Sequence, residues 1–175
     1  MTDKAATPAA AVVLMGVCGS GKSTIGHALA LATGGRFFDG DDFHSPANVE
    51  KMRAGVSLTD FDRQGWLETL RDLIDHECHD STGAPVFLAC SALKESYRAI
   101  LRAGAQDVRF VFLHGSPELI RARMMARSNH FMPETLIDSQ FQTLEAPADA
   151  LVVDISLPPE AVVARIMEHL RLIRP

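Results

Sequence analysis

The chain alternates short apolar runs with longer helix-forming stretches. The apolar runs are bounded by turn residues and predict five short strands, at residues 12–15, 36–38, 85–90, 108–113 and 151–153. Helix-forming stretches lie between them, at residues 23–32, 47–53, 94–102, 117–127 and 133–142. This order predicts an α/β fold, because strands joined through helices pair in parallel within one sheet.

Two further helices are predicted from the spacing of their apolar residues. One follows a predicted loop at residues 55–62 and ends before Ser81, and its apolar side contains Trp66, Leu67, Leu70, Leu73 and Ile74. The other begins at Pro158, and its apolar stripe contains Val162, Ile166, Leu170 and Ile173. The complete set of elements predicts a doubly wound, parallel five-stranded sheet with helices on both faces.

Composition narrows the class of protein. With 175 residues, 47% of them hydrophobic, the chain can build one core, so we expect a flexible tail at residues 1–11 and a single domain at 12–175. The net charge of -5 argues against nucleic-acid or anionic-membrane partners, and no apolar run is long enough to span a membrane. Cys18, Cys78 and Cys90 are odd in number and widely spaced, which predicts neither a disulfide framework nor a zinc site and favours the cytoplasm.

The first predicted strand leads into a phosphate-binding pattern, G-x-x-x-x-G-K-[ST]. Its residues are Gly16, Val17, Cys18, Gly19, Ser20, Gly21, Lys22 and Ser23, and Thr24 follows them in the predicted helix. Glycines let successive backbone N–H groups point to one centre, where the helix N-terminus adds its positive end. We expect Lys22 to reach the terminal phosphates of ATP and the Ser23 hydroxyl to bind Mg²⁺. A glycine-rich turn without a ligand is the alternative.

Acidic residues follow the second predicted strand, opposite this loop. In a parallel doubly wound sheet, ligands bind beyond the carboxyl ends of the strands, and Asp39 and Asp41 lie at such an end. Carboxylates there can hold Mg²⁺ through water or accept the proton of a substrate hydroxyl. We assign Asp39 to the metal, together with Ser23, and Asp41 to the hydroxyl. The alternative is that both residues only form turns and helix caps.

Basic residues gather in the loops and helices beside these strand ends, namely Lys51, Arg53, Arg63, Lys94, Arg98, Arg123 and Arg127. Lys94 and Arg98 are four residues apart, as are Arg123 and Arg127, so each pair shares one helix face. The segment 123–145 contains no predicted strand. It is the predicted lid, which would bring arginine to the phosphates and exclude water. Solvated surface charges and an ordinary helical hairpin are the alternatives.

Several segments together resemble the gluconokinase family. They are residues 16–23, 39–44 (DGDDFH), 48–52 (NVEKM), 58–67 (LTDFDRQGWL), 90–94 (CSALK) with Tyr97 and Arg98, His130 with Phe131, and 140–145 (QFQTLE). The likeness runs from about residue 12 to the terminal helix. It implies a P-loop fold of the nucleoside-monophosphate-kinase type with a small helical lid, often a homodimer. The implied reaction is ATP-dependent phosphorylation of D-gluconate at its 6-hydroxyl, which feeds the pentose phosphate or Entner-Doudoroff route.

The resemblance also implies a role for each matching residue. Lys22, Asp41 and Arg127 would be catalytic, and Arg123 and Arg127 would join residues 16–24 in binding the nucleotide. The implied substrate-binding residues are Asp41, His44, Lys51, Arg63, Ser91, Lys94, Arg98, His130 and Gln140. Cations among them suit the carboxylate of gluconate, and the uncharged polar groups suit its hydroxyls.

Three positions depart from the usual pattern of the family. Cys18 stands where serine is usual, Thr59 where asparagine is usual and Gly65 where proline is usual.

Two other functions remain alternatives. A shikimate-type or nucleotide kinase is one, although a shikimate-type site typically has Gly-Gly-Gly after the third strand, where residues 91–93 read Ser-Ala-Leu. A nucleotide-binding switch is the other, although the guanine-reading N-K-x-D motif does not occur.

Overall fold

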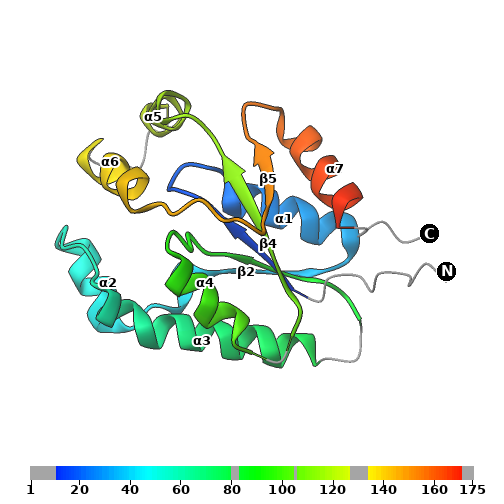
Figure 1. Cartoon of the computed structure of the whole chain (residues 1–175), viewed down its shortest axis with the longest axis horizontal. Helices are drawn as coiled ribbons and strands as arrows, with labels where there is room; N and C mark the ends of the chain where they lie inside the picture. Colours follow the sequence, from blue (N-terminus) through cyan, green and yellow to red (C-terminus); the bar gives the residue numbers. More distant parts are fainter. Residues whose placement is uncertain (1–10, 80–82, 105, 127–133, 171–175) are drawn as a thin grey trace.

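One parallel sheet forms the centre of the molecule (Figure 1). The computed structural model describes residues 11–79, 83–104, 106–126 and 134–170. Its strands are β1 (Ala11–Met15), β2 (Arg36–Asp39), β3 (Val86–Ala89), β4 (Val108–His114) and β5 (Leu151–Asp154), in the spatial order β2-β3-β1-β4-β5. The predicted parallel α/β sheet is therefore confirmed. Ala11, which the sequence assigned to the tail, already pairs with Val86 and Val108.

The central strand β1 explains why helices cover both faces. All five of its residues are buried, and successive side chains point to opposite faces. Val12 and Leu14 pack with apolar residues of α1 (Lys22–Thr33) and α7 (Pro159–His169). Val13 and Met15 pack with residues of α3 (Asp60–Cys78) and α4 (Glu95–Arg102), which run along the other face in Figure 1. Two apolar clusters, one on each face, therefore hold the sheet.

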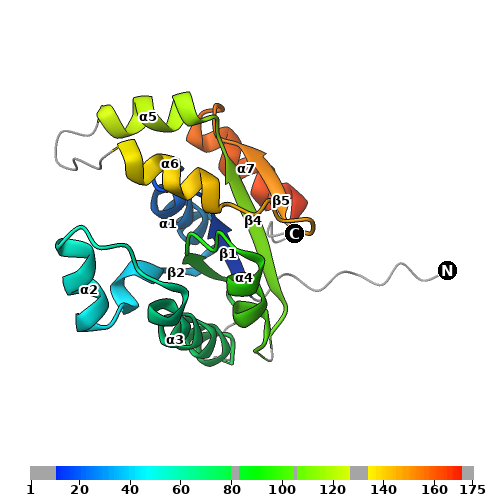
Figure 2. The ribbon, with the colours of Figure 1, turned by 60° about the vertical axis from the view of Figure 1, so that its left-hand side comes forward.

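The remaining helices stand at the carboxyl ends of the strands. They are the 3₁₀ helix η1 (Gly40–Phe43), α2 (Pro46–Arg53), α5 (Pro117–Met125) and α6 (Glu134–Thr143). In Figures 1 and 2, α5 and α6 run side by side and α2 stands across from them. The predicted lid thus corresponds to the end of α5 and to α6, whereas residues 127–133 lie outside the described part of the chain.

The predicted loop at residues 55–62 was partly wrong, because α3 begins at Asp60. Thr59 caps this helix by accepting a hydrogen bond from the Asp62 backbone N–H at 3.2 Å, and the Asp62 carboxylate accepts from the Thr59 N–H at 2.9 Å. This capping box satisfies two N–H groups that a helix start leaves without partners. The short helix η1 was also not predicted. Among the described residues, no helix combines the length and apolarity that crossing a membrane requires.

Candidate active site

The phosphate-binding pattern of residues 16–23 forms a P-loop, which joins β1 to the start of α1. The conformation of this loop depends on its glycines. Gly16, Gly19 and Gly21 have φ angles of 141°, 82° and 92°, which other residues rarely adopt. A Cβ on Gly19 would lie 2.8 Å from the sulfur of Met124, so α5 packs directly against the loop. Ser20 is buried in the loop, and its hydroxyl has no hydrogen-bond partner among the described residues. The glycines therefore allow a tightly turned and closely packed loop that residues with a Cβ could not adopt without strain.

Lys22 places a cation at the centre of the loop. Its ammonium group donates to the carbonyl oxygens of Gly16 and Val17, each at 3.1 Å. Burial lowers the pKa of Lys22, and the negative charges of neighbours that include Asp41 and Asp39 act in the opposite direction. A half-buried cation held in this way is preorganised to meet a strongly negative group such as a phosphate.

The end of β2 supplies oxygen donors next to Lys22. The Ser23 hydroxyl donates a hydrogen bond to the Asp39 carboxylate at 2.7 Å, which brings the two predicted metal residues together. The described residues contain no group of three or more His, Cys, Asp or Glu side chains that could hold a metal ion by themselves. A hydroxyl with one carboxylate is nevertheless a suitable partial site for Mg²⁺, which usually takes its other ligands from phosphates and water.

Asp41 and His44 line one wall of the neighbouring cavity. His44 stacks on Trp66 with ring centroids 4.2 Å apart, and the Trp66 indole N–H donates to the Gly40 carbonyl at 2.7 Å. The His44 Nε2 lies 3.9 Å from the Asp41 carboxylate, and the buried His44 Nδ1 has no partner among the described residues. Burial lowers the pKa of His44, so a neutral imidazole that can exchange hydrogen bonds with hydroxyls is favoured.

The pKa of the Asp41 carboxyl is raised. Protein atoms around the cavity wall displace part of its hydration, and the charge of Asp39 adds to this, while Lys22 and His44 act in the opposite direction. Its side chain still opens into the cavity. A carboxylate with a raised pKa is a better proton acceptor than an ordinary exposed one, so Asp41 is suited to a hydroxyl.

A cavity of about 580 Å³, the larger of the two described here, lies between the P-loop, α2, α3, α6 and the loop after β3. It contains six of the predicted substrate residues, Asp41, His44, Arg63, Ser91, Lys94 and Gln140, together with Lys22. From α6, the side-chain oxygen of Gln140 accepts a hydrogen bond from the Cys18 backbone N–H at 2.7 Å. The predicted lid helix therefore contacts the P-loop and forms part of the cavity wall.

The three cations of this cavity, Lys22, Arg63 and Lys94, differ in their partners. The Lys94 ammonium lies 2.8 and 2.9 Å from the two oxygens of Asp60, and the Tyr97 hydroxyl donates to the same carboxylate. These bonds lower the pKa of Asp60, so the pair stays charged. Arg63 instead donates to the Leu58 carbonyl oxygen, and no carboxylate of the described residues forms an ion pair with it. Lys22 likewise contacts only carbonyl oxygens, but it belongs to the P-loop, so Arg63 is the cation on the opposite wall best placed to meet an acidic ligand.

A second cavity of about 280 Å³ lies on the other side of the P-loop. Its wall contains Gly19, Gly21 and Thr24 of the P-loop region, Arg123 of α5, and Ile155 and Leu157 after β5. The Arg123 guanidinium donates to the Ile155 carbonyl oxygen at 2.5 Å, which links α5 to the segment after β5. Residues of the P-loop therefore line two cavities, with Lys22 facing the larger one.

Some predicted site residues lie elsewhere. Lys51 forms an ion pair with Asp62 at 2.6 Å and does not line either described cavity. Arg98 is 1% exposed, and its guanidinium contacts the loop after β3 from behind the cavity. Arg127 and His130 lie outside the described residues. Asp60 and Tyr97 were not predicted as site residues, because Asp60 is 34 residues from Lys94 and no spacing rule connects them.

A phosphate loop that holds a lysine, lines two cavities and follows the central strand of a parallel α/β sheet is the arrangement of a P-loop phosphotransferase. The sequence pattern of the family described as "Shikimate kinase" matches residues 18–171. "Gluconokinase" from Arabidopsis thaliana is 43% identical over 172 residues, which cover 90% of this chain and 90% of that protein. "Thermosensitive gluconokinase" from Escherichia coli (strain K12) is 45% identical over 150 residues, 82% of this chain and 78% of that protein.

A solved structure agrees with these relatives. The crystal structure of a gluconokinase from Sinorhizobium meliloti 1021 superposes with a TM-score of 0.83 at 41% identity, covering 94% of this chain and 93% of that one. The chain therefore belongs to the shikimate kinase family and, within it, to the gluconokinases. The fold and enzyme class that the sequence resemblance implied are confirmed.

Proposed function

We propose that this protein transfers the γ-phosphoryl group of ATP to the 6-hydroxyl of D-gluconate. The observation that carries the proposal is which cations of the larger cavity already form ion pairs with carboxylates of the protein and which do not. Arg63 has no ion-pair partner among the described residues, and it stands beside polar groups that suit hydroxyls. A small polyol with one carboxylate needs this combination, because its charge must be matched while its hydroxyls are hydrogen-bonded. The gluconokinase relatives support the same acceptor.

The P-loop side fits ATP with Mg²⁺. The loop glycines leave room for phosphate oxygens beside the backbone N–H groups, and the N-terminus of α1 adds positive potential. Ser23 and Asp39 would hold Mg²⁺, which supplies charge neutralisation at the β- and γ-phosphates when bound. The nucleoside part would occupy the second cavity, where Arg123 lies in the wall.

On the acceptor side, each polar group has a distinct proposed task. Arg63 binds the carboxylate of gluconate, whereas Lys94 and Asp60, already paired with each other, contact hydroxyls. His44, Ser91 and Gln140 line the same cavity and offer further hydroxyl partners. This arrangement directs the other end of the acceptor to Asp41 and Lys22, beside the phosphates.

In the transfer step, the 6-oxygen of gluconate forms a bond to the γ-phosphorus as the bond from that phosphorus to the β,γ-bridging oxygen breaks. The bridging oxygen keeps the electron pair and leaves as part of ADP. Asp41 aims the hydroxyl and accepts its proton late, because the transition state is loose. Lys22 stabilises the charge that develops on the phosphates. Arg127, from the predicted lid, is proposed to add a second positive charge there.

A coupled assay of ADP release tests the proposal. The acceptors are D-gluconate, D-glucitol, shikimate and nucleoside monophosphates; glucitol keeps the primary alcohol of gluconate but lacks the carboxylate. We expect ADP release with gluconate, formation of 6-phosphogluconate by mass spectrometry, and little activity with glucitol. Equal activity with glucitol would contradict the role of Arg63. If only shikimate were phosphorylated, the acceptor would be shikimate rather than gluconate. If every acceptor gave only basal ATP hydrolysis, a nucleotide-binding switch would be favoured.

A further inference from the structure

The loop that joins β3 to α4 has an unusual backbone conformation at the cavity wall. Four of its five residues, those at positions 91–94, line the larger cavity. Ala92 has a φ angle of 45°, and it is the only non-glycine residue of the described part with a positive φ. A residue with a Cβ adopts this left-handed conformation only when its surroundings hold it there. The contacts that hold Ala92 therefore decide the shape of this wall.

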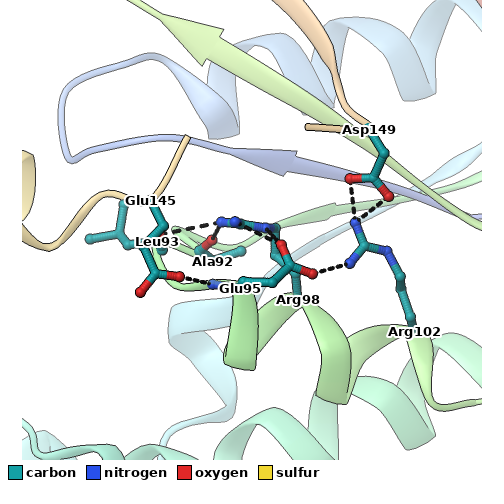
Figure 3. Close-up of polar contacts among 7 residues, drawn as sticks. All are labelled: Ala92, Leu93, Glu95, Arg98, Arg102, Glu145 and Asp149. Carbon is teal, nitrogen blue, oxygen red and sulfur yellow. Dashed lines mark hydrogen bonds and ion pairs between the residues drawn. The ribbon is translucent and has the colours of Figure 1, made fainter. Parts of the chain in front are cut away.

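Arg98 supplies two of those contacts from behind the wall. Its Nη1 donates to the Ala92 carbonyl oxygen at 2.9 Å and to the Leu93 carbonyl oxygen at 3.3 Å (Figure 3). Its Nε and Nη2 both lie 2.8 Å from one oxygen of Glu95. The side chain is 1% exposed and does not belong to the lining of the cavity. The planar guanidinium thus spans two carbonyls and one carboxylate, which a single ammonium group cannot do.

The same loop is held from two other directions. The Gly16 N–H of the P-loop donates to the Ser91 carbonyl at 3.3 Å, and the Glu145 N–H donates to the Leu93 carbonyl at 2.8 Å. The Glu145 carboxylate in turn accepts from the Glu95 N–H at 2.6 Å, at the start of α4 (Figure 3). Those two backbone bonds end on Ser91 and Leu93, whereas Arg98 also reaches the carbonyl oxygen of Ala92, the residue in the left-handed conformation.

The partners of Arg98 also remove it from direct substrate binding. Glu95 neutralises its charge, and the bonds to Arg98 and Arg102 lower the pKa of Glu95, so the ion pair persists. We propose that Arg98 is a positioning residue, which fixes the Ala92 conformation and thereby places Ser91 and Lys94 against the acceptor. The kinetic part of this inference rests on the proposed function, whereas the effect on the loop does not.

Two substitutions and one control test the proposal. Arg98→Met keeps length but loses every bond, and Arg98→Lys keeps the charge but can satisfy only part of the acceptors. Arg102→Met is the matched control, because Arg102 lies one turn further along α4, pairs with Glu95 and Asp149, and does not touch the loop. We expect kcat/KM for gluconate to fall on the order of 10²-fold in Arg98→Met, as a misplacement of about 1 Å can cause. Arg98→Lys should fall less, Arg102→Met should match wild type, and the KM for ATP should stay unchanged in all three.

A second measurement does not depend on the acceptor. Amide hydrogen exchange followed by mass spectrometry should show faster exchange at residues 91–94 in both Arg98 variants, with the P-loop peptide unchanged as internal control. Unchanged exchange there, or an equal effect of Arg102→Met, would overturn the proposal. So would a parallel loss of ATP and gluconate binding. If wild type fails to phosphorylate gluconate while the exchange result holds, the proposed function fails and the positioning role of Arg98 stands. If Arg98→Met does not fold, Arg98→Lys decides.

Discussion

The nucleotide side and the acceptor side of this site are built in different ways. The nucleotide side consists mainly of consecutive residues, 16–24, whose backbone conformation follows from their own glycines, and Asp39 joins them from the end of β2. The acceptor side brings together α2, α3, the loop after β3 and α6, whose residues are far apart in sequence. Local sequence therefore determines most of the first region, whereas tertiary contacts determine the second.

Charge shows what this difference means. On the nucleotide side, the predicted Lys22, Ser23 and Asp39 lie together, with Ser23 and Asp39 joined by a hydrogen bond. On the acceptor side, Lys51 pairs with Asp62, and Arg98 pairs with Glu95. A sequence gives the charge of a side chain but not its partner, and the partner decides whether the charge is available to a ligand. Variants on each side can therefore separate the two regions experimentally.

The largest effect is expected at Asp41, where the two regions meet. Asp41→Asn keeps the size of the side chain but cannot accept a proton, and loss of a general base typically lowers the rate by about 10²–10⁴-fold. We expect kcat to fall by this much while the KM for ATP is nearly retained. Steady-state kinetics at saturating gluconate measure both constants.

The pH profile of wild type gives a second test of Asp41. Because the pKa of the Asp41 carboxyl is raised, kcat/KM should decline on the acid side at a higher pH than an ordinary carboxyl would give.

Asp39→Asn is the matched control for Asp41→Asn. If Asp39 acts through Mg²⁺, its activity should be lost more strongly at low magnesium and should partly recover when magnesium is raised. If raised magnesium restored activity to Asp41→Asn but not to Asp39→Asn, then Asp41 would bind the metal and Asp39 would act on the hydroxyl. If neither substitution changed kcat, the transfer site would lie elsewhere in the cavity.

Lys22→Ala tests the nucleotide side alone. Removing one preorganised charge contact to the transition state typically costs about 10²–10³-fold in kcat, and we expect a loss of this size in a variant that keeps the wild-type circular dichroism spectrum. Lys51→Ala is the control, because the Lys51 ammonium lies on Asp62 and outside the described cavities. A folded Lys22→Ala with normal turnover would contradict the assignment of the P-loop.

Arg63→Ala tests the acceptor side alone. A hydrogen bond to a charged group contributes about 1.5–3 kcal/mol, so the KM for gluconate should rise about 10- to 100-fold. The KM for ATP should not change, since this substitution removes binding to the acceptor only. A rise in the KM for ATP instead would assign Arg63 to the nucleotide side. Lys94→Met should raise the KM for gluconate less, because Asp60 already neutralises Lys94.

The sequence predicted the sheet and the P-loop well because both have local signals. Five apolar runs gave five strands, and the glycine pattern gave the loop. The start of α3 was missed because the signal is a reciprocal pair, Thr59 and Asp62, inside a stretch that contains no apolar periodicity. The partner of Lys94 was missed for a different reason, since Asp60 reaches it only through the packing of α3 against α4.

The smallest effect is expected for a substitution of Asp62. It tests how far the acceptor side depends on ion pairs between helices, here the pair of Asp62 in α3 with Lys51 in α2. Its bond to Lys51, and then its bonds to the Thr59 N–H and hydroxyl, lower the pKa of Asp62 from 3.8 to about 2. A carboxyl whose pKa is lowered in the folded state adds stability above its unfolded pKa, and the added stability is lost as the pH falls through the folded pKa.

Asp62→Asn should therefore lower Tm by no more than a few degrees at neutral pH, and the difference from wild type should shrink between pH 4 and pH 2. Thermal unfolding across this pH range measures it. Asp72→Asn is the control, because Asp72 is an exposed carboxylate of the same helix that pairs with its neighbour Arg71. A Tm difference that stayed constant down to pH 2 would mean that Asp62 acts through its shape rather than its charge. In that case the link between α2 and α3 would not depend on the ion pair with Lys51.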